Sequence, residues 1–192
     1  MKKVGVLALQ GDFEAHSQAL ARAGAAPVLA RTAADLETLD GLVIPGGEST
    51  TMLKLMAVEN LFEPLEEFGR HRPIFGTCAG AILLASDVTH PAQQSLGLMN
   101  LTVERNGYGR QIDSRVAHLA PAPEFEQRTR SGDLEAVFIR APIIRRVGPE
   151  ARVLATYQGD PVLVEQGRHL VATFHPELSS DSRVHELFLS KL

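Results

Sequence analysis

Residues 72–84 read RPIFGTCAGAILL, a short apolar run that turns through glycines into a stretch with helical character. The turn carries the only cysteine of the chain, Cys78, between Gly76 and Gly80. Small flanking residues allow a sharp strand-to-helix turn that leaves the reactive atom exposed at the end of the strand. The positive end of the new helix would also favour the thiolate over the thiol. The stretch therefore predicts a strand, a turn and a helix, with Cys78 either a nucleophile or a small buried thiol.

Apolar strands and helices alternate on both sides of this turn. We expect strands at residues 4–9, around residue 28, at 42–44 and at 73–75. We expect helices at residues 13–23, 49–58 and 64–70, and another directly after Cys78. Continuous apolar strands that alternate with helices indicate a parallel sheet covered on both faces. Sheets of this kind bind ligands at the carboxyl ends of their strands.

The chain beyond Pro91 is richer in β structure. We expect further strands at residues 101–104, 136–139, 152–156, 161–165 and 169–174. Gly159-Asp160 and Gln166-Gly167 are typical of turns between antiparallel strands. Residues 121–133 are polar and contain prolines, which predicts a surface excursion, and residues 182–192 have the spacing of a closing helix.

These elements predict an α/β fold with three layers. We expect a mostly parallel central sheet with helices on both faces, and a smaller antiparallel β element beside it. With 192 residues, of which 44% are hydrophobic, the chain is long enough for one substantial core and short for two. We therefore expect a single domain over residues 1–192.

Charge and composition make several kinds of partner unexpected. The 19 basic and 23 acidic residues are mixed along the chain without a basic run, so we expect no binding to nucleic acid. The first apolar run, residues 4–9, is too short for a signal peptide or a membrane span, which leaves the cytoplasm as the expected location. One cysteine forms neither an internal disulfide nor a multi-cysteine zinc site, and we expect no metal and no cofactor.

His175 offers a base for Cys78. The strand at 170–174 would deliver it to the carboxyl end of the sheet, and Pro176 would stop further ladder pairing. Glu177 could point the same way as His175 in an extended chain, so that its carboxylate holds the imidazole in one tautomer. Strands of one sheet can end side by side although their residues are far apart in sequence. The alternative is that His175 is a hydrogen-bonded histidine in a turn, without a catalytic role.

A third candidate segment is residues 42–51, which read LVIPGGESTT. A strand opens here through Gly46 and Gly47 into a helix, whose cap we expect at Ser49 or Thr50. The segment is either a tight turn without a ligand or part of an oxyanion hole. In the second case the donors would be the N–H groups of Gly47 and of Ala79, the residue after Cys78.

The other histidines lack the spacing of metal ligands. We expect them at surfaces or helix caps; they are His16, His71, His90, His118, His169 and His185.

Together, the three segments around Cys78, His175 and Gly46 resemble the class I, or triad, glutamine amidotransferases. Further segments are similar to the branch of that family that serves pyridoxal 5'-phosphate synthesis. The matching segments span nearly the whole chain and are LALQG at 7–11, PGGESTT at 45–51, GTCAG at 76–80, VERN at 103–106, GRQ at 109–111, FIRAP at 138–142 and HPEL at 175–178. One departure is Arg115-Val116, where that branch commonly has an aromatic residue followed by an acid.

The resemblance implies hydrolysis of L-glutamine to L-glutamate and ammonia, with the ammonia passed to a separate synthase barrel that builds pyridoxal 5'-phosphate. Cys78 would attack the amide, His175 would move the proton and Glu177 would orient His175. Gln10 would touch the oxyanion region or the partner interface. The guanidinium of Arg105 suits the α-carboxylate of the substrate. The residues implied to hold glutamine are Gly46, Gly47, Glu48, Arg105, Ile139 and Arg140.

Two other readings remain open from the sequence. One is another cysteine hydrolase, or a glutaminase subunit that serves a different synthase. The other is a redox-sensing or chaperone-like module in which Cys78 is oxidised rather than acylated. Such a module would not need the His175-Pro176-Glu177 segment or the Gly46-Gly47 turn, and both are present.

Overall fold

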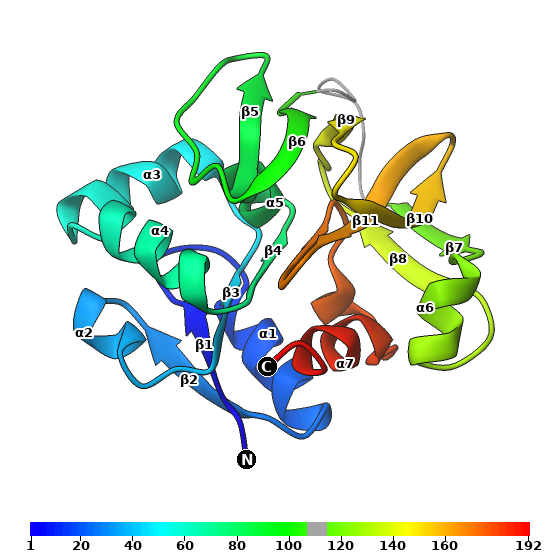
Figure 1. Ribbon diagram of the computed structural model, residues 1–192, viewed down its shortest axis with the longest axis horizontal. Coiled ribbons are helices and arrows are strands. Elements are labelled where there is room, and N and C mark those ends of the chain that lie inside the picture. The colour runs from blue at the N-terminus through cyan, green and yellow to red at the C-terminus, as the bar shows by residue number, and fades with distance from the viewer. Residues whose placement is uncertain (107–114) are drawn as a thin grey trace.

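The centre of the protein is a seven-stranded sheet in a computed structural model that describes residues 1–106 and 115–192 (Figure 1). Its strands are β1 (Lys3–Leu7), β2 (Ala26–Ala30), β3 (Gly41–Ile44), β4 (Ile74–Thr77), β10 (Arg152–Tyr157), β11 (Asp160–Gln166) and β12 (His169–Ala172). They lie in the order β10-β11-β12-β4-β3-β1-β2. Every residue of β3, β4 and β12 is buried, as continuous apolar strands require when both faces of a sheet are covered.

The sheet is parallel from β2 to β12 and antiparallel beyond. β1 pairs in parallel with β2 and β3, β3 pairs with β4, and β4 pairs with β12. β12, β11 and β10 are joined by two hairpins and run antiparallel. The hairpin turns at residues 159–160 and 166–167 are thus confirmed. They extend the central sheet instead of forming a separate element.

Helices cover both faces of the sheet. Successive residues of a strand therefore pack into two different hydrophobic clusters, one on each face. In β3, Leu42 and Ile44 pack in one hydrophobic cluster and Val43 packs in the other. The first cluster includes residues of α2 (Ala33–Leu36), α3 (Ser49–Val58), α4 (Phe62–His71) and α5 (Ala79–Leu84). The second includes residues of α1 (Phe13–Arg22), α6 (Pro123–Arg128) and α7 (Arg183–Leu189).

Two smaller sheets complete the β structure. β5 (Ala85–Thr89), β6 (Met99–Glu104) and β9 (Ile143–Val147) form a mixed sheet, and β7 (Arg115–Leu119) pairs antiparallel with β8 (Leu134–Phe138). The predicted three-layer α/β architecture with a smaller antiparallel element is confirmed. The strands β5, β7 and β9 and the short helix α2 were not predicted.

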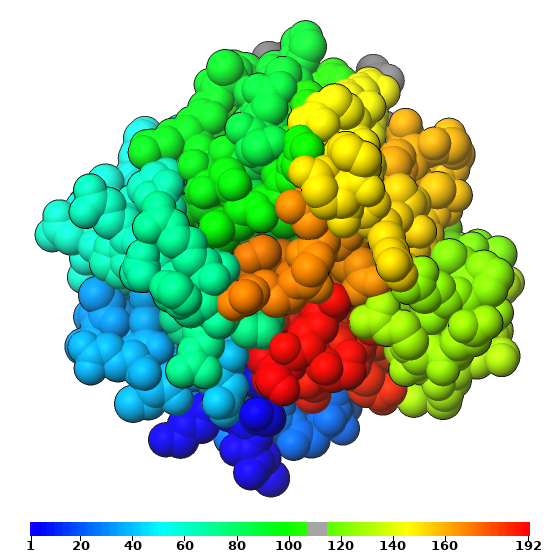
Figure 2. Space-filling view, in the orientation of Figure 1, coloured from blue at the N-terminus to red at the C-terminus, as the bar shows by residue number. Residues whose placement is uncertain are grey.

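The segment 121–133 lies on the surface, as predicted, but it contains the helix α6. Pro123 begins this helix, where its missing N–H costs nothing, and Phe125 is fully buried. In Figure 2 the red C-terminal segment with α7 sits between the blue N-terminal residues and the yellow-green segment that contains α6. No helix of residues 1–106 or 115–192 has the length and apolar character needed to cross a membrane.

Candidate active site

The ends of four parallel strands meet at one edge of the sheet. Because β12, β4, β3 and β1 are neighbours and run the same way, the residues that follow them lie side by side in that order. These residues are His175 after β12, Cys78 after β4, Gly46 after β3 and Gln10 after β1. The topology thus brings together three segments that the sequence singled out separately.

Cys78 occupies a strained turn between β4 and α5. Its backbone has φ 50° and ψ −105°, a region that residues with a side chain rarely adopt, and its N–H donates to the carbonyl of Ala172 at 2.9 Å. The turn needs both flanking glycines: a Cβ on Gly76 would overlap the carbonyl of Gly80, and a Cβ on Gly80 would overlap the carbonyl of Ile44. The predicted strand-turn-helix around Cys78 is confirmed.

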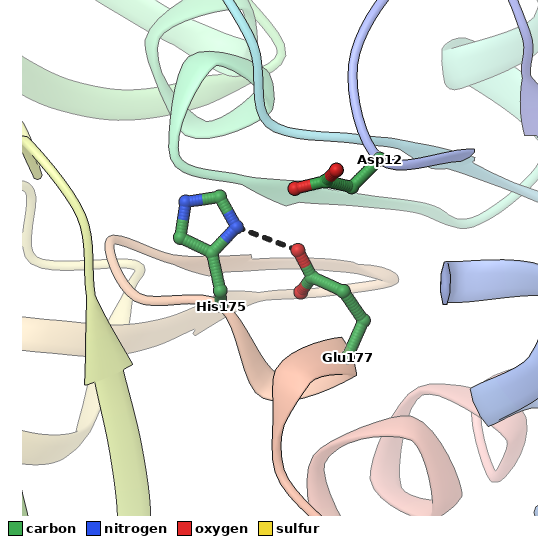
Figure 3. A group of neighbouring side chains, drawn as sticks. All are labelled: Asp12, His175 and Glu177. Carbon is green, nitrogen blue, oxygen red and sulfur yellow. Dashed lines mark hydrogen bonds and ion pairs between the residues drawn. The ribbon is translucent and has the colours of Figure 1, made fainter. Parts of the chain in front are cut away.

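The side chains of His175 and Glu177 form a buried pair. Nδ1 of His175 lies 2.6 Å from Oε1 of Glu177, and the two side chains are 5% and 0% exposed (Figure 3). The predicted pairing is correct, but the chain between them is a 3-10 turn over Pro176–Leu178 and not an extended segment. The backbone N–H of His175 donates to the carbonyl of Val137, which fixes the start of this turn against β8.

The surroundings of His175 favour its imidazolium form. Burial alone lowers the pKa of His175, but hydrogen bonds and charge interactions with Cys78 and Glu177 outweigh burial and raise that pKa to about 10. His175 therefore carries a proton at neutral pH. A histidine charged in this way, between a sulfur and a carboxylate, is suited to protonate a leaving group.

Gly46 lies directly against the side chains of His175 and Cys78. A Cβ on Gly46 would be 2.5 Å from Cε1 of His175 and 3.2 Å from Cβ of Cys78. On its other side, the carbonyl oxygen of Gly46 packs on Gly11, where a Cβ would overlap it. Only glycine at both positions allows this approach.

Gln10 supports the Gly46-Gly47 turn from the loop after β1. Its Oε1 accepts a hydrogen bond from the backbone N–H of Glu48 at 3.0 Å. Gly47 has φ 149°, and a Cβ there would overlap the same Oε1. Gln10 therefore contacts the proposed oxyanion turn itself, one of the two places expected for it.

Glu48 caps α3, so the prediction that Ser49 or Thr50 is the cap was wrong. Its carboxylate accepts from the backbone N–H groups of Thr50 at 3.0 Å and Thr51 at 2.7 Å. Burial would raise the pKa of Glu48, but the hydrogen bonds from Thr51 and Thr50 lower it to about 2. The carboxylate is therefore ionised at neutral pH, which suits the positive end of a helix.

Arg105 lies next to this cap. Its Nη2 donates to Oγ1 of Thr50 at 2.8 Å and lies 3.3 Å from Oε1 of Glu48. The Arg105 side chain is 14% exposed, so most of it is enclosed by its neighbours. Glu48 and Arg105 are thus brought together by the structure, although they come from different parts of the chain.

Ile139 and Arg140 follow β8, a strand of the separate two-stranded sheet. The carbonyl oxygen of Ile139 lies 3.9 Å from Sγ of Cys78, so the Ile139 backbone borders the cysteine sulfur. Arg140 has φ 45° and is exposed. Its guanidinium has no hydrogen bond to Cys78, His175 or Glu177 within the part of the chain that the structure describes.

Ala79 is the first residue of α5 and follows Cys78 directly. The first N–H groups of a helix have no partner within the helix, so the Ala79 N–H is available to a ligand beside the sulfur. The position therefore suits the predicted role in an oxyanion hole.

Asp12 adds a second carboxylate close to His175. One ligand-type atom of each of Asp12, His175 and Glu177 lies within 4.8 Å of the others (Figure 3). Because Nδ1 of His175 is already hydrogen-bonded to Glu177, we interpret Asp12 as a further negative charge near the imidazolium and not as part of a metal centre. Asp12 is exposed, so solvent weakens its influence.

Three of the remaining histidines are not where the sequence predicted them. His16, His185 and His169 are buried, and only His71, His90 and His118 are exposed. His16 lies in α1 on the face that also buries Ala19 and Leu20, and His185 lies between buried residues of α7. The helical spacing of these apolar neighbours is the signal that could have placed both histidines in the core.

Parts of the sequence prediction fall outside the described residues. The segment Gly109-Arg110-Gln111 and the residues before Arg115 lie in 107–114. Arg115 itself begins β7, and its Nη1 donates to the hydroxyl of Tyr157 at 2.9 Å.

Comparisons with known proteins place this geometry in context. A model of the SNO glutamine amidotransferase family matches residues 6–192. The pyridoxal 5'-phosphate synthase subunit PdxT of Solibacter usitatus is 67% identical over 192 residues and covers all of both chains. PdxT of Koribacter versatilis is 54% identical over 187 residues, which are 97% of this chain and 94% of that protein. A crystal structure of a glutamine amidotransferase matches with 43% identity and a TM-score of 0.89, over 98% of this chain and 97% of that one.

Proposed function

The chain belongs to the SNO glutamine amidotransferase family, and on that premise we propose that it hydrolyses L-glutamine to L-glutamate and ammonia as the glutaminase subunit of a pyridoxal 5'-phosphate synthase. The observation that carries the proposal is the meeting of Cys78 and His175 at Gly46, with Glu177 bonded to the far side of the imidazole. A nucleophile, a base and a group that orients the base are the parts that acyl transfer requires.

The reaction proceeds through a thioester. The sulfur of Cys78 attacks the side-chain amide carbon of glutamine, and the carbonyl electrons move onto oxygen. When they return, the carbon–nitrogen bond breaks, and His175 gives its proton to the nitrogen, which leaves as ammonia. Neutral His175 then takes a proton from water, whose oxygen attacks the thioester. Glutamate leaves, and Cys78 and His175 return to their starting states.

The negative oxygen of each tetrahedral intermediate needs donors. We assign this role to the backbone N–H groups of Ala79 and Gly47. In a trans peptide the N–H points opposite to the carbonyl, so packing the Gly46 carbonyl on Gly11 turns the Gly47 N–H away from β1. Loss of one such donor costs about 3 kcal/mol of transition-state stabilisation.

Glutamine binding is assigned to residues around this turn. Arg105 binds the α-carboxylate, and Glu48 and Thr50 hold the guanidinium in place for that contact. Since the carboxylate of Glu48 is occupied by the helix cap, Glu48 acts by placing Arg105. Gly46 and Gly47 line the acyl group, and Ile139 and Arg140 close the site from β8.

The product ammonia goes to a partner. In free water it would be protonated and lost as a nucleophile, so a glutaminase of this kind works bound to the synthase subunit that consumes ammonia. We assign residues 1–192 to one glutaminase domain. We place the complex in the cytoplasm, where glutamine and sugar phosphates are present.

The test is glutamate formation from glutamine by the chain mixed with its synthase subunit. We expect the wild type to form glutamate and to support pyridoxal 5'-phosphate synthesis. Cys78→Ala should abolish both, while added ammonium salt restores pyridoxal 5'-phosphate synthesis because only the nucleophile is missing. Glutamate formation by Cys78→Ala would refute the assignment. A wild type without glutaminase activity, but with Cys78 that oxidises reversibly, would favour a redox module.

A further inference from the structure

A set of buried polar side chains lies behind Glu177, on the side away from His175. Nε2 of His16, in α1, lies 3.0 Å from Oγ1 of Thr77 and 3.3 Å from Oε2 of Glu177. Nδ1 of the same ring lies 3.1 Å from Nε2 of His185, in α7. Figure 1 shows α1 and α7 as neighbours. His16, Thr77 and His185 are all 0% exposed, so these contacts exclude water.

Glu177 needs a polar neighbour on that side. Its side chain is fully buried, and Oε1 is hydrogen-bonded to His175, but Oε2 has no hydrogen-bond partner among the described residues. A buried carboxylate oxygen with no polar group beside it is strongly unfavourable. The ring of His16 is the polar group that approaches Oε2.

Both His16 and His185 are neutral. Burial, followed by the charges of His185 and His175, holds the pKa of His16 well below its usual range. Burial, followed by the charge of Arg22, lowers the pKa of His185 to about 4. Each ring therefore carries a single N–H, and its position must be deduced from the neighbours.

Two arrangements of these protons are possible. If Nδ1 of His16 carried the proton, a bare nitrogen would face the carboxylate of Glu177, and Nδ1–H of His185 would be buried without an acceptor. If Nε2 of His16 carries it, this N–H donates to Oγ1 of Thr77 and lies beside Oε2 of Glu177, and Nε2–H of His185 donates to Nδ1 of His16. Nδ1 of His185 has no partner among the described residues, and a buried lone pair is tolerated better than a buried N–H. The second arrangement is therefore favoured both by the carboxylate of Glu177 and by the surroundings of Nδ1 of His185.

We propose that His16 is a positioning residue for the glutaminase reaction: its Nε2–H, fixed by the hydrogen bonds of the ring to Thr77 and His185, presents positive polarity 3.3 Å from Oε2 of Glu177 and so keeps Oε1 on Nδ1 of His175. The inference rests on the proposed function, because it assigns His16 a part in orienting the base of that reaction. His16 does not touch the substrate. It acts through Glu177.

The charged and titratable groups around this unit come from several elements. The groups that face His175 are Glu177, Cys78 and Asp12. The groups that face His16 are Thr77, Glu177 and His185. The positive charge of Arg22 acts on His185. Weakening the hold on Glu177 should therefore be felt as a lower proton affinity of His175. This change is one that a merely structural role of His16 would not produce.

Three variants separate positioning from packing. His16→Phe keeps a ring of similar size but removes both nitrogens. His16→Gln keeps an amide N–H that can reach the place of Nε2–H. His169→Gln is the matched control. His169 is also buried, but it begins β12, at the end remote from His175, and it accepts a hydrogen bond from the N–H of Ile74 in β4.

Kinetics are measured with the complete complex of this chain and its synthase subunit. For His16→Phe we expect kcat to fall about tenfold at unchanged KM, and the alkaline limb of the kcat/KM profile to move to lower pH. His16→Gln should recover most of kcat, and His169→Gln should leave kcat and the pH profile as in the wild type. A His16→Phe enzyme with wild-type kcat and pH profile, or an equal loss in His169→Gln, overturns the proposal.

A second measurement does not need activity. NMR titration of His175 reports its proton affinity in the folded chain, and thermal unfolding shows whether each variant is folded. We expect the His175 titration to move to lower pH in His16→Phe and to return toward the wild type in His16→Gln. If the wild-type complex makes no glutamate, the proposed function fails. Separately, a His175 titration that stays at the wild-type pH in His16→Phe, or that moves as far in His16→Gln as in His16→Phe, overturns the inference about His16.

Discussion

Nδ1 of His175 lies 2.6 Å from Oε1 of Glu177, although only Pro176 separates the two residues in the chain. The single 3-10 turn that makes this contact begins directly after the sheet edge where Cys78 lies. One short segment therefore supplies both the proposed base and the group proposed to orient it. The arrangement fixes the imidazole with its Nδ1–H on the carboxylate, which leaves Nε2 for the sulfur and the substrate.

Replacing Glu177 with Gln tests this relationship. The amide fills the same space, but it can present its NH₂ group to Nδ1 and so favour the wrong tautomer. We expect turnover to fall, by less than the about 10⁴-fold loss that the analogous change causes in a serine protease, because a thiol ionises more readily than a hydroxyl. Steady-state glutamate formation in the complex measures the effect. Turnover close to the wild type would leave a Cys78–His175 dyad without a third member.

The pH dependence follows from the raised pKa of His175, about 10 against an ordinary 6.5. A raised pKa in the folded state stabilises the protein fully below the ordinary value, and this contribution is lost as the pH rises through about 10. The proton needed by the leaving ammonia disappears over the same range. We therefore expect His175 to titrate near pH 10 by NMR and kcat to decline there. Titration of His175 near its ordinary value would contradict the charged imidazole described above.

The contact of Gly11 with Gly46 predicts a large effect from one methyl group. Gly11→Ala would push the Cβ into the Gly46 carbonyl and displace the Gly46-Gly47 peptide, so we expect glutaminase activity to fall by about 10²-fold or more. Gly24→Ala is the matched control. Gly24 has φ 93° against 92° for Gly11, but nothing lies within 4 Å of its Cβ position. Equal activity of the two variants would show that the turn does not need this close approach.

The same turn predicts activation by the partner. The Gly46-Gly47 peptide is bounded by Gly11 and Gln10, and this loop after β1 is partly exposed, so a bound subunit can reach it. A partner that binds one state of the loop better shifts the peptide toward that state. We expect the chain alone to hydrolyse glutamine slowly and the complex to hydrolyse it substantially faster. Equal rates with and without the synthase subunit, at saturating glutamine, would mean that the oxyanion hole is already formed.

The sequence predicted the sheet edge well, because that part of the fold depends on local signals. Continuous apolar strands, glycines at turns and the helix that follows Cys78 are each visible within a few residues. The parallel sheet then places Cys78 and His175 together, since both follow parallel neighbouring strands. The pairing of His175 with Glu177 was predicted for the right residues, but through an extended chain where the protein uses a 3-10 turn.

Features that depend on tertiary contacts were missed. His16 and His185 lie on helix faces with apolar neighbours, but the hydrogen bond that makes their burial tolerable joins residues 169 positions apart in sequence. Without that contact in view, a surface position was the ordinary expectation for each polar residue. The cap of α3 is Glu48 because its longer side chain reaches back to two N–H groups, whereas capping preferences favour Ser and Thr. The short strand β9 carries Arg145 and Arg146. Its sequence has no clear alternation of apolar and polar residues, so the sequence did not predict a strand there.

The central claim is that glutamine is hydrolysed through a thioester on Cys78. The most direct measurement is mass spectrometry of the complex after rapid acid quenching during turnover of glutamine. We predict that the peptide with Cys78 gains the mass of one γ-glutamyl group, glutamine less ammonia, and that no such peptide is found for Cys78→Ala. Glutamate formation with the adduct on another residue, or by Cys78→Ala without any adduct, would contradict the account.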